Sequence, residues 1–370
     1  MAGMKIKRIE PIAVSMPMRK AIKMAGVELK TAENVLVRVE TDDGVIGWGE
    51  AASAPTMTGE TVEGMMAAAR YLTPYVVGSD LSDIANVSRR MDRALYGNYG
   101  IKSAIEIALH DALGKAHGKP IFELLGGQRR DRIPTLRMIA ANNAEADVIE
   151  AKRAKSEGYV AFKVKVGTGD PLTDAERVRR VCEALNGDVL ISADANQGFS
   201  VDEALTFVRA LEGSGLDFFE QPVMGEDIPG MARIAAATDI AIGCDEGVHR
   251  PDDLRRHHEA RAARGASLKA VKLGGLQPVC EAALLCEELG MKVNLAGKIS
   301  ESGIASAAVL HLAACVPSLD WGVSPTSPYL TEDVLATPLR FENGHAYVPT
   351  GPGLGIEVDE KLVRKYTIER

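Results

Sequence analysis

The chain has 370 residues, of which 46% are hydrophobic and 25% charged, and its formal net charge is −8. This length suggests two domains or one large barrel with additions, and the composition is typical of a globular protein. The negative charge argues against nucleic acid as a partner, and no apolar run is long enough to cross a bilayer, so we expect no membrane partner either. The N-terminus lacks an apolar signal region, and the five cysteines show no paired spacing. Both features predict a cytoplasmic protein with reduced thiols.

Residues 1–131 predict an α+β domain. Strand-like stretches at 5–18 and 33–51 precede helical stretches at 60–78 and 101–127, and helices that follow a small antiparallel sheet form such a unit. Two segments between these elements, 17–30 and 54–61, are expected to be loops. The first contains Arg19, Lys20, Lys23 and Lys30 but only one acid. It is either a solvated face or a surface that attracts an anion.

From Arg132 to about residue 325 the chain alternates between apolar runs and amphipathic stretches. The eight apolar runs are 133–140, 159–166, 188–195, 216–222, 240–246, 267–274, 292–297 and 318–324. Amphipathic stretches such as 173–185 and 201–213 lie between them. This alternation predicts a closed parallel β/α barrel, in which the carboxyl ends of all strands meet at one rim.

Charged residues recur near the ends of successive runs at intervals of about 25 residues, roughly one strand, one helix and two loops. They are Lys163, Lys165, Asp194, Glu220, Asp245 and Lys269. One charged residue at a strand end is often a solvated loop residue, but a whole set in even register predicts a single site. Three converging carboxylates repel one another, so they need a counter-charge. Carboxylates without His or Cys suit Mg²⁺ or Mn²⁺ better than zinc.

Alternation along an extended segment refines this picture. Lys163 and Lys165 are two residues apart and therefore share a face of their strand. Glu246 is adjacent to Asp245, so we expect its side chain to point away from the carboxylate cluster.

These residues resemble the enolase superfamily, and specifically the muconate lactonizing enzyme subgroup of its mandelate racemase/muconate lactonizing enzyme family. The matching motifs, which span nearly the whole chain, are Lys163-x-Lys165, Asp194-x-Asn196, Glu220-Gln221-Pro222, Asp245-Glu246 and the Lys269 segment that runs into Gly274-Gly275. The resemblance implies a modified TIM (β/α)-barrel at 132–325. It also implies that an α+β capping domain at 1–131 closes over the barrel mouth and is completed by the C-terminal segment 326–370.

The resemblance also implies the site residues. Asp194, Glu220 and Asp245 are the expected ligands of Mg²⁺ (or Mn²⁺), and Lys165, Lys269 and Lys163 are the expected catalytic residues. In the family, the two N-terminal loops reach the active site and choose the substrate. The candidate substrate contacts are Lys20, Lys23, Thr56, Arg137, Asn196, Lys298 and Glu301. For Arg137, an outward salt bridge is an equally open interpretation.

Two departures from the family pattern bear on the substrate. Lys298 stands where a small residue is often found, which adds a cation near the barrel mouth, either against the substrate or paired with Glu301. Dipeptide epimerases of the subgroup carry Asp-x-Asp after the eighth strand, whereas this chain has Ser324-Pro325-Thr326. No acid remains there to bind an α-ammonium group, which argues against a dipeptide substrate. Lys20 and Lys23 of the basic segment, together with Lys298, suggest instead a substrate with a second anionic or acceptor-rich end.

We therefore expect an isomerase that removes the α-proton of a small carboxylate substrate to give a metal-stabilised enediolate. Lys165 and Lys269 would flank the substrate on opposite faces, and Lys163 would lower the pKa of Lys165. Two bases favour a racemase or epimerase of an amino-acid-type carboxylate. A muconate-type cycloisomerase or a dehydratase is the alternative, and a non-catalytic protein that binds an acidic ligand is a remote one. A homo-oligomer is expected.

Overall fold

The computed structural model describes residues 4–24 and 27–369. Its N-terminal part, called the cap below, contains a three-stranded antiparallel sheet of order β1-β2-β3. Its elements are β1 (Ile6–Met24), β2 (Val27–Thr41), β3 (Ile46–Ala52), α1 (Val62–Val76), α2 (Ile84–Ala94), α3 (Tyr99–His117) and α4 (Ile121–Leu124). Helix α3 packs closely on β3 because two glycines leave room for its backbone. A Cβ on Gly47 would lie 2.1 Å from the Ala108 carbonyl oxygen, and one on Gly49 would lie 1.9 Å from that of Ala104.

Strands β1 and β2 extend further than the sequence predicted. The segment 17–30, expected to be a loop, continues both strands, with Ile22 paired to Leu29 and Met24 to Val27. A register shift between Pro17 and Ile22 accommodates the proline, which cannot donate a ladder hydrogen bond. The segment is therefore the end of a long β-hairpin.

The C-terminal part is a barrel of eight parallel strands in the order β12-β11-β10-β9-β8-β7-β6-β5. A parallel bridge between Thr135 and Val323 joins the first strand to the last. The strands are β5 (Leu136–Ile139), β6 (Ala161–Lys165), β7 (Leu190–Asp194), β8 (Phe218–Glu220), β9 (Ala241–Cys244), β10 (Gly265–Leu268), β11 (Lys292–Ala296) and β12 (Val323–Ser324). The architecture confirms the predicted modified TIM barrel with an α+β cap.

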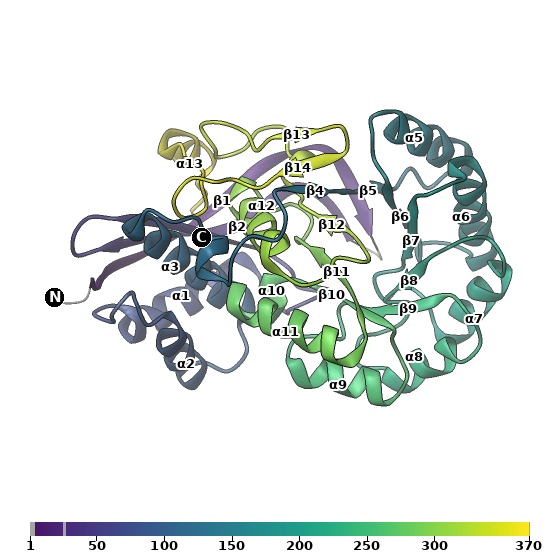
Figure 1. The fold of residues 1–370 in the computed structure, drawn as a ribbon, viewed down its shortest axis with the longest axis horizontal. Helices are drawn as coiled ribbons and strands as arrows, with labels where there is room; N and C mark the ends of the chain where they lie inside the picture. Colours follow the sequence, from purple (N-terminus) through teal and green to yellow (C-terminus); the bar gives the residue numbers. More distant parts are fainter. Residues whose placement is uncertain (1–3, 25–26, 370) are drawn as a thin grey trace.

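Helices connect the strands and form the outer ring. They are α5 (Ala144–Ser156), α6 (Pro171–Leu185), α7 (Val201–Ala210), α8 (Ile228–Ala235), α9 (Pro251–Glu259), α10 (Ala270–Leu273), α11 (Leu276–Leu289) and α12 (Gly303–Cys315). Figure 1 shows α5 to α9 curving around strands β6 to β9, with α1 to α3 of the cap at the other end of the molecule. The segment directly after β12 forms the short 3₁₀ helix η1 (Ser327–Tyr329) in place of an α-helix.

The apolar run at 133–140, predicted to be one strand, is two. Its first part is β4 (Arg132–Pro134), which pairs antiparallel with β14 (His345–Tyr347), and β14 in turn pairs with β13 (Phe341–Glu342). Thr135 separates β4 from β5 and donates from both its backbone nitrogen and its Oγ1 to the Gly344 carbonyl, each at 2.9 Å. Thr135 also bridges to Val323 on β12, so it lies at the junction between the small sheet and the barrel.

The C-terminal tail returns to the cap. Its helix α13 (Glu360–Tyr366) is followed by Thr367, which bridges to Val14 on β1, and by Ile368, whose nitrogen donates to the Ala13 carbonyl at 2.9 Å. Within residues 4–24 and 27–369, no helix combines the length and apolar character needed to cross a bilayer.

Two buried carboxylates of the cap bind backbone amides of the barrel. Glu50 on β3 accepts hydrogen bonds from the Ser302 nitrogen at 2.8 Å and the Ala305 nitrogen at 3.0 Å, at the start of α12. Glu106 on α3 likewise accepts from the nitrogens of Leu276 and Gln277 at 2.8 and 3.1 Å, at the start of α11. Both carboxylates satisfy amides that a helix leaves free in its first turn. They therefore fix the cap over the barrel.

Candidate active site

The candidate site is a cavity of about 1460 Å³ between the cap and the carboxyl ends of the barrel strands. The cap contributes residues 28–31 and 53–57 to its wall, and the strand ends contribute Lys163, Lys165, Asp194, Glu246, Lys269 and Lys298. Parallel barrels place their active sites at this rim, where the loops after all the strands meet. The even spacing of charged residues in the sequence therefore corresponds to one site.

Lys163 bridges two of the predicted metal ligands. Its Nζ donates to Glu220 Oε2 and lies 3.7 Å from Asp194 Oδ2, and all three side chains are buried. Burial alone would lower the pKa of Lys163, but the charges of Glu220 and Asp194 outweigh it and raise that pKa. Burial raises the pKa of Glu220, against the effect of Lys163. The positive charge expected beside Lys165 is thus balanced by two carboxylates.

Lys165 lies in lateral register with Asp194 on β7, which in turn is in register with Glu220 on β8. Its Nζ is 2.7 Å from Asp194 Oδ2 and donates to Asn196 Oδ1 at 2.6 Å. Burial would raise the pKa of Asp194, but Lys165 and then Lys163 lower it. The Asp-x-Asn motif therefore gives Lys165 two acceptors, one charged and one neutral.

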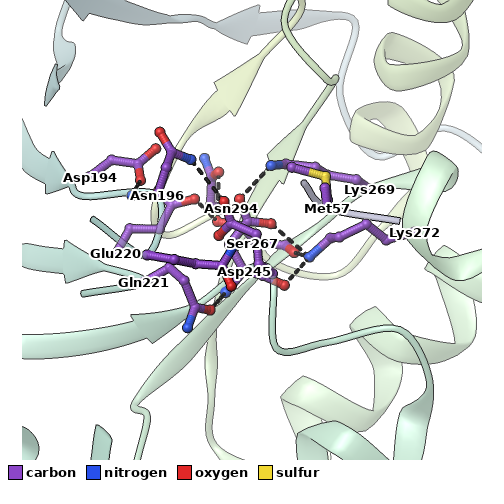
Figure 2. Close-up of polar contacts among 12 residues, drawn as sticks. Met57, Asp194, Asn196, Glu220, Gln221, Asp245, Ser267, Lys269, Lys272 and Asn294 are labelled. Carbon is purple, nitrogen blue, oxygen red and sulfur yellow. Dashed lines mark hydrogen bonds and ion pairs between the residues drawn. The ribbon is translucent and has the colours of Figure 1, made fainter. Parts of the chain in front are cut away.

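Asp245 follows β9 and contacts two lysines. Lys269 donates to its Oδ2, and Lys272 Nζ lies 2.7 Å from its Oδ1. Figure 2 shows both lysines reaching Asp245 from one side, with Asp194, Asn196 and Glu220 on the other. Burial would raise the pKa of Asp245, but the two ammonium groups lower it. Sequence reasoning missed Lys272, although its place three residues after Lys269, on the one-turn helix α10, was a usable signal.

A layer of polar side chains beneath the rim holds these groups in place. Ser267 Oγ donates to Glu220 Oε1 at 2.7 Å and lies 3.1 Å from Asn294 Oδ1. Gln221 Oε1 accepts from the backbone nitrogen of Asp245 at 2.7 Å. These residues were also missed as site components. Ser267 and Asn294 lie on β10 and β11 in the barrel interior, where alternation would otherwise place apolar side chains.

The position of Glu246 differs from the prediction. It was expected to point away from the cluster, but it lines the cavity and accepts from Asn196 Nδ2 at 3.0 Å. The segment after β9 is a bend rather than an extended strand, so the alternation argument does not apply to it. Burial, followed by the charge of Asp245, raises the pKa of Glu246 to about 7. Its Oε2 is buried without a hydrogen-bond partner in the described part of the chain.

The donor set suits a divalent cation, although lysines supply the positive charge here. In the described part of the chain, no three His, Cys, Asp or Glu side chains form a ready-made ion site, and lysine ammonium groups bind an oxygen of each of the three carboxylates. The buried carboxylates of Asp194, Glu220 and Asp245 come from adjacent strands, are all negatively charged donors of the kind that Mg²⁺ and Mn²⁺ prefer, and require a cation among them. The unpartnered Oε2 of Glu246 adds to that requirement. The residues therefore fit the implied ion.

The predicted substrate contacts divide into two groups. Thr56, Asn196 and Lys298 line the cavity, and Glu301 is buried behind Gly297, where a Cβ would lie 2.4 Å from its Oε2. Two others lie outside the cavity wall. Lys20 and Arg137 both face Glu150 on α5, at 3.9 and 3.1 Å. Arg137 alternates with Leu136 and Met138, which do line the cavity, so it points outward from β5. The Lys23 side chain lies outside the described residues.

Comparison with known families accounts for almost the whole chain. The family described as "Mandelate racemase / muconate lactonizing enzyme, N-terminal domain" matches residues 8–126. The one described as "Enolase C-terminal domain-like" matches residues 146–362.

Individual relatives cover the chain equally well. The N-succinyl-L-Arg/Lys racemase of Bacillus cereus is 31% identical and the alignment covers 99% of this chain and 98% of the relative. Muconate cycloisomerase 1 of Rhodococcus opacus is also 31% identical, over 99% of this chain and 100% of the relative. Among solved structures, the same racemase matches with a TM-score of 0.93 at 31% identity, covering 99% of this chain and 98% of that one. A muconate lactonizing enzyme of Pseudomonas fluorescens with muconolactone matches with a TM-score of 0.94 at 30% identity, and the match covers 99% of this chain and 100% of that one.

Proposed function

The chain belongs to the mandelate racemase/muconate lactonizing enzyme family of the enolase superfamily and is an isomerase, and from this premise we propose that it racemises or epimerises an amino-acid-type carboxylate. The reaction would remove the proton from the carbon next to the substrate carboxylate and return it to the other face. Such a proton is very weakly acidic, so the enzyme must supply a base, an acid and positive charge for the enediolate.

The observation that carries the proposal is the placement of two lysines across the barrel mouth. Lys165 ends β6 and Lys269 follows β10. In the strand order, β7, β8 and β9 separate these strands on one side, and β11, β12 and β5 separate them on the other. They are therefore diametrically opposed in the closed barrel, and both lysines line the cavity. A substrate between them has one lysine at each face of its α-carbon.

Asp194, Glu220 and Asp245 would hold Mg²⁺ or Mn²⁺, and the bound ion supplies the positive charge that stabilises the enediolate. Lys165 and Lys269 now neutralise Asp194 and Asp245, and they are free to face the substrate when the same oxygens hold the ion. Lys163, held by Glu220, remains as a buried ammonium group on the same face of β6 as Lys165. Asn196, whose oxygen accepts from Lys165, orients that ammonium group.

The test is exchange of the substrate α-proton for deuterium in D₂O, followed by NMR on a panel of single-enantiomer N-acylamino acids with Mg²⁺ present. Exchange together with appearance of the opposite enantiomer supports the proposal. A panel on which no α-proton exchanges at all counts against it.

Muconate-type cycloisomerisation is the second candidate, because the muconate cycloisomerase relative is as similar to the chain as the racemase. A dehydratase would use the same lysines. Each of these reactions can proceed with one acid–base lysine, so formation of a lactone or loss of water without racemisation distinguishes them from the favoured reaction.

A further inference from the structure

The wall of the cavity formed by β11 and β12 has an unusual polar composition. Lys298 lies two residues after β11, lines the cavity and is 8% exposed. Its Nζ makes no hydrogen bond or ion pair with any described residue, in contrast to Lys163, Lys165, Lys269 and Lys272, which all bind carboxylates. Burying an ammonium group without a partner is costly, so a buried, unpaired lysine at a cavity wall indicates a ligand group that completes it.

A second orphaned group lies beside it. Ser324, at the end of β12, is the strand partner of Ala296 on β11, and Gly297 donates to its carbonyl at 2.9 Å. Ser324 also lines the cavity, and its Oγ is buried without a partner among the described residues. The nearest acid on this wall, Glu301, does not form an ion pair with Lys298, since no oxygen–nitrogen distance between them is within 4.0 Å in the described structure. Burial and the neighbouring Glu50 raise the pKa of Glu301 to about 8, so its carboxyl is largely neutral at pH 7.

Strand order sets the direction in which this wall faces. In the closed barrel, β11 lies opposite β7 and β12 lies opposite β8. Lys298 and Ser324 therefore face Asp194 and Glu220 across the mouth, while Lys165 and Lys269 occupy the two remaining sides. A substrate whose reacting carboxylate lies at the acidic side directs its other end toward Lys298.

We propose that Lys298 and Ser324 form a subsite for a second anionic group of the substrate, so that the enzyme acts on carboxylates with another carboxylate several bonds from the α-carbon. The ammonium of Lys298 donates to that carboxylate, and the Ser324 hydroxyl donates alongside it. This assignment rests on the proposed function for the position of the reacting carboxylate. The absence of acidic residues at 324–326 agrees with this subsite, because carboxylates at those positions would repel the second anionic group of the substrate.

N-succinylglycine and N-butanoylglycine form a suitable probe pair. Both carry the α-carboxylate and exchangeable α-protons, and only the first has a distal carboxylate. Their dissociation constants are measured by calorimetry at pH 7 with Mg²⁺ present, on the wild type and on Lys298→Met, Ser324→Ala and Lys20→Met. The last is the matched control, since Lys20 is an exposed lysine that faces Glu150 outside the cavity.

We expect the wild type to bind N-succinylglycine at least about tenfold more tightly than N-butanoylglycine, as for a charge-assisted hydrogen bond in a buried site. Lys298→Met abolishes the preference, Ser324→Ala reduces it, and Lys20→Met retains it. The inference is overturned if the wild type binds neither probe, if it shows no preference, or if Lys298→Met keeps the preference. If Lys298→Met does not fold, the test is decided by the preference of the wild type for N-succinylglycine over N-butanoylglycine and by whether Ser324→Ala reduces that preference.

Deuterium exchange on the same probes separates this inference from the proposed function. A preference for N-succinylglycine without any exchange supports the subsite and counts against α-proton chemistry. Exchange of both probes with equal dissociation constants supports the chemistry and overturns the subsite.

Discussion

Replacing each opposed lysine by methionine separates the two faces of the proposed reaction. Lys165→Met removes the base at one face of the α-carbon, and Lys269→Met removes the base at the other. Each variant should lose α-proton exchange from one enantiomer and keep it for the other. Net racemisation should disappear in both, because it needs a proton donor on the face opposite the base.

The expected loss of stability depends on which lysine partner each carboxylate keeps after the substitution. After Lys269→Met, Asp245 still has Lys272 at 2.7 Å, and after Lys165→Met, Asp194 still has Lys163 at 3.7 Å. Neither variant leaves a buried charge without a counter-ion, so the stability loss should stay below the roughly 3–5 kcal/mol typical of a broken buried pair. The loss of rate should be about 10²–10⁴-fold, as for removal of a general acid or base. A large loss of rate in a folded protein can then be attributed to the chemistry.

The assay is stereospecific deuterium incorporation into each enantiomer of an N-acylamino acid, with circular dichroism to confirm folding. Lys20→Met is the control, because this lysine faces Glu150 rather than the cavity, and its exchange rates should match those of the wild type. If Lys269→Met retains full racemase activity, the two-base reasoning is wrong and the site is one-sided.

Three further outcomes are expected. Removal of divalent ions by EDTA should abolish exchange, Mg²⁺ or Mn²⁺ should restore it, and Asp245→Asn should weaken Mg²⁺ binding measured by calorimetry; exchange that survives thorough chelation would contradict this. Burial lowers the pKa of Lys298 to about 8, with Glu301 opposing and Lys269 assisting the shift, so the subsite cation is present below that pH and lost above it. KM for a substrate with a distal carboxylate should therefore rise above pH 8 in the wild type and level off about tenfold higher once the cation is lost, and it should show no such rise in Lys298→Met. Glu50→Ala should lower the free energy of unfolding by about 2–4 kcal/mol, because buried amides lose their acceptor, and an unchanged urea midpoint would show that Glu50 does not join the cap to the barrel.

The sequence predicted the barrel and the convergence of its charged residues because both depend on periodicity. A charged residue at each strand end, repeated at the length of one βα unit, leaves few alternatives to a common rim. The same reasoning could not pair the charges. Lys163 on β6 contacts Glu220 on β8, two strands along the sheet, and Lys272 reaches Asp245 from a one-turn helix. Both contacts depend on side-chain geometry, which a spacing pattern does not contain.

The errors have local causes. Glu246 was placed by strand alternation in a segment where the backbone bends, so the period of two no longer holds. Lys20 was expected at the cavity because it lies in a basic run, but that run forms a paired hairpin, and the side chain extends to Glu150 on α5. Arg137 shows the opposite case. Alternation along β5 was sufficient to direct it outward, and the open alternative of an outward salt bridge is the one that the structure contains.

The joints between cap and barrel bear on how enzymes of this architecture change substrate. Glu50 and Glu106 bind backbone amides at 302–305 and 276–277, and every residue except proline offers the same amide. Apart from the Ser302 hydroxyl, which also donates to Glu50 at 2.6 Å, these contacts do not depend on the side chains of the barrel segments that they hold. Residues of the cavity wall, such as Lys298, can be substituted during evolution while the cap stays bound to the barrel. Selection for a new substrate can then act on the residues that line the cavity without changing the contacts between cap and barrel.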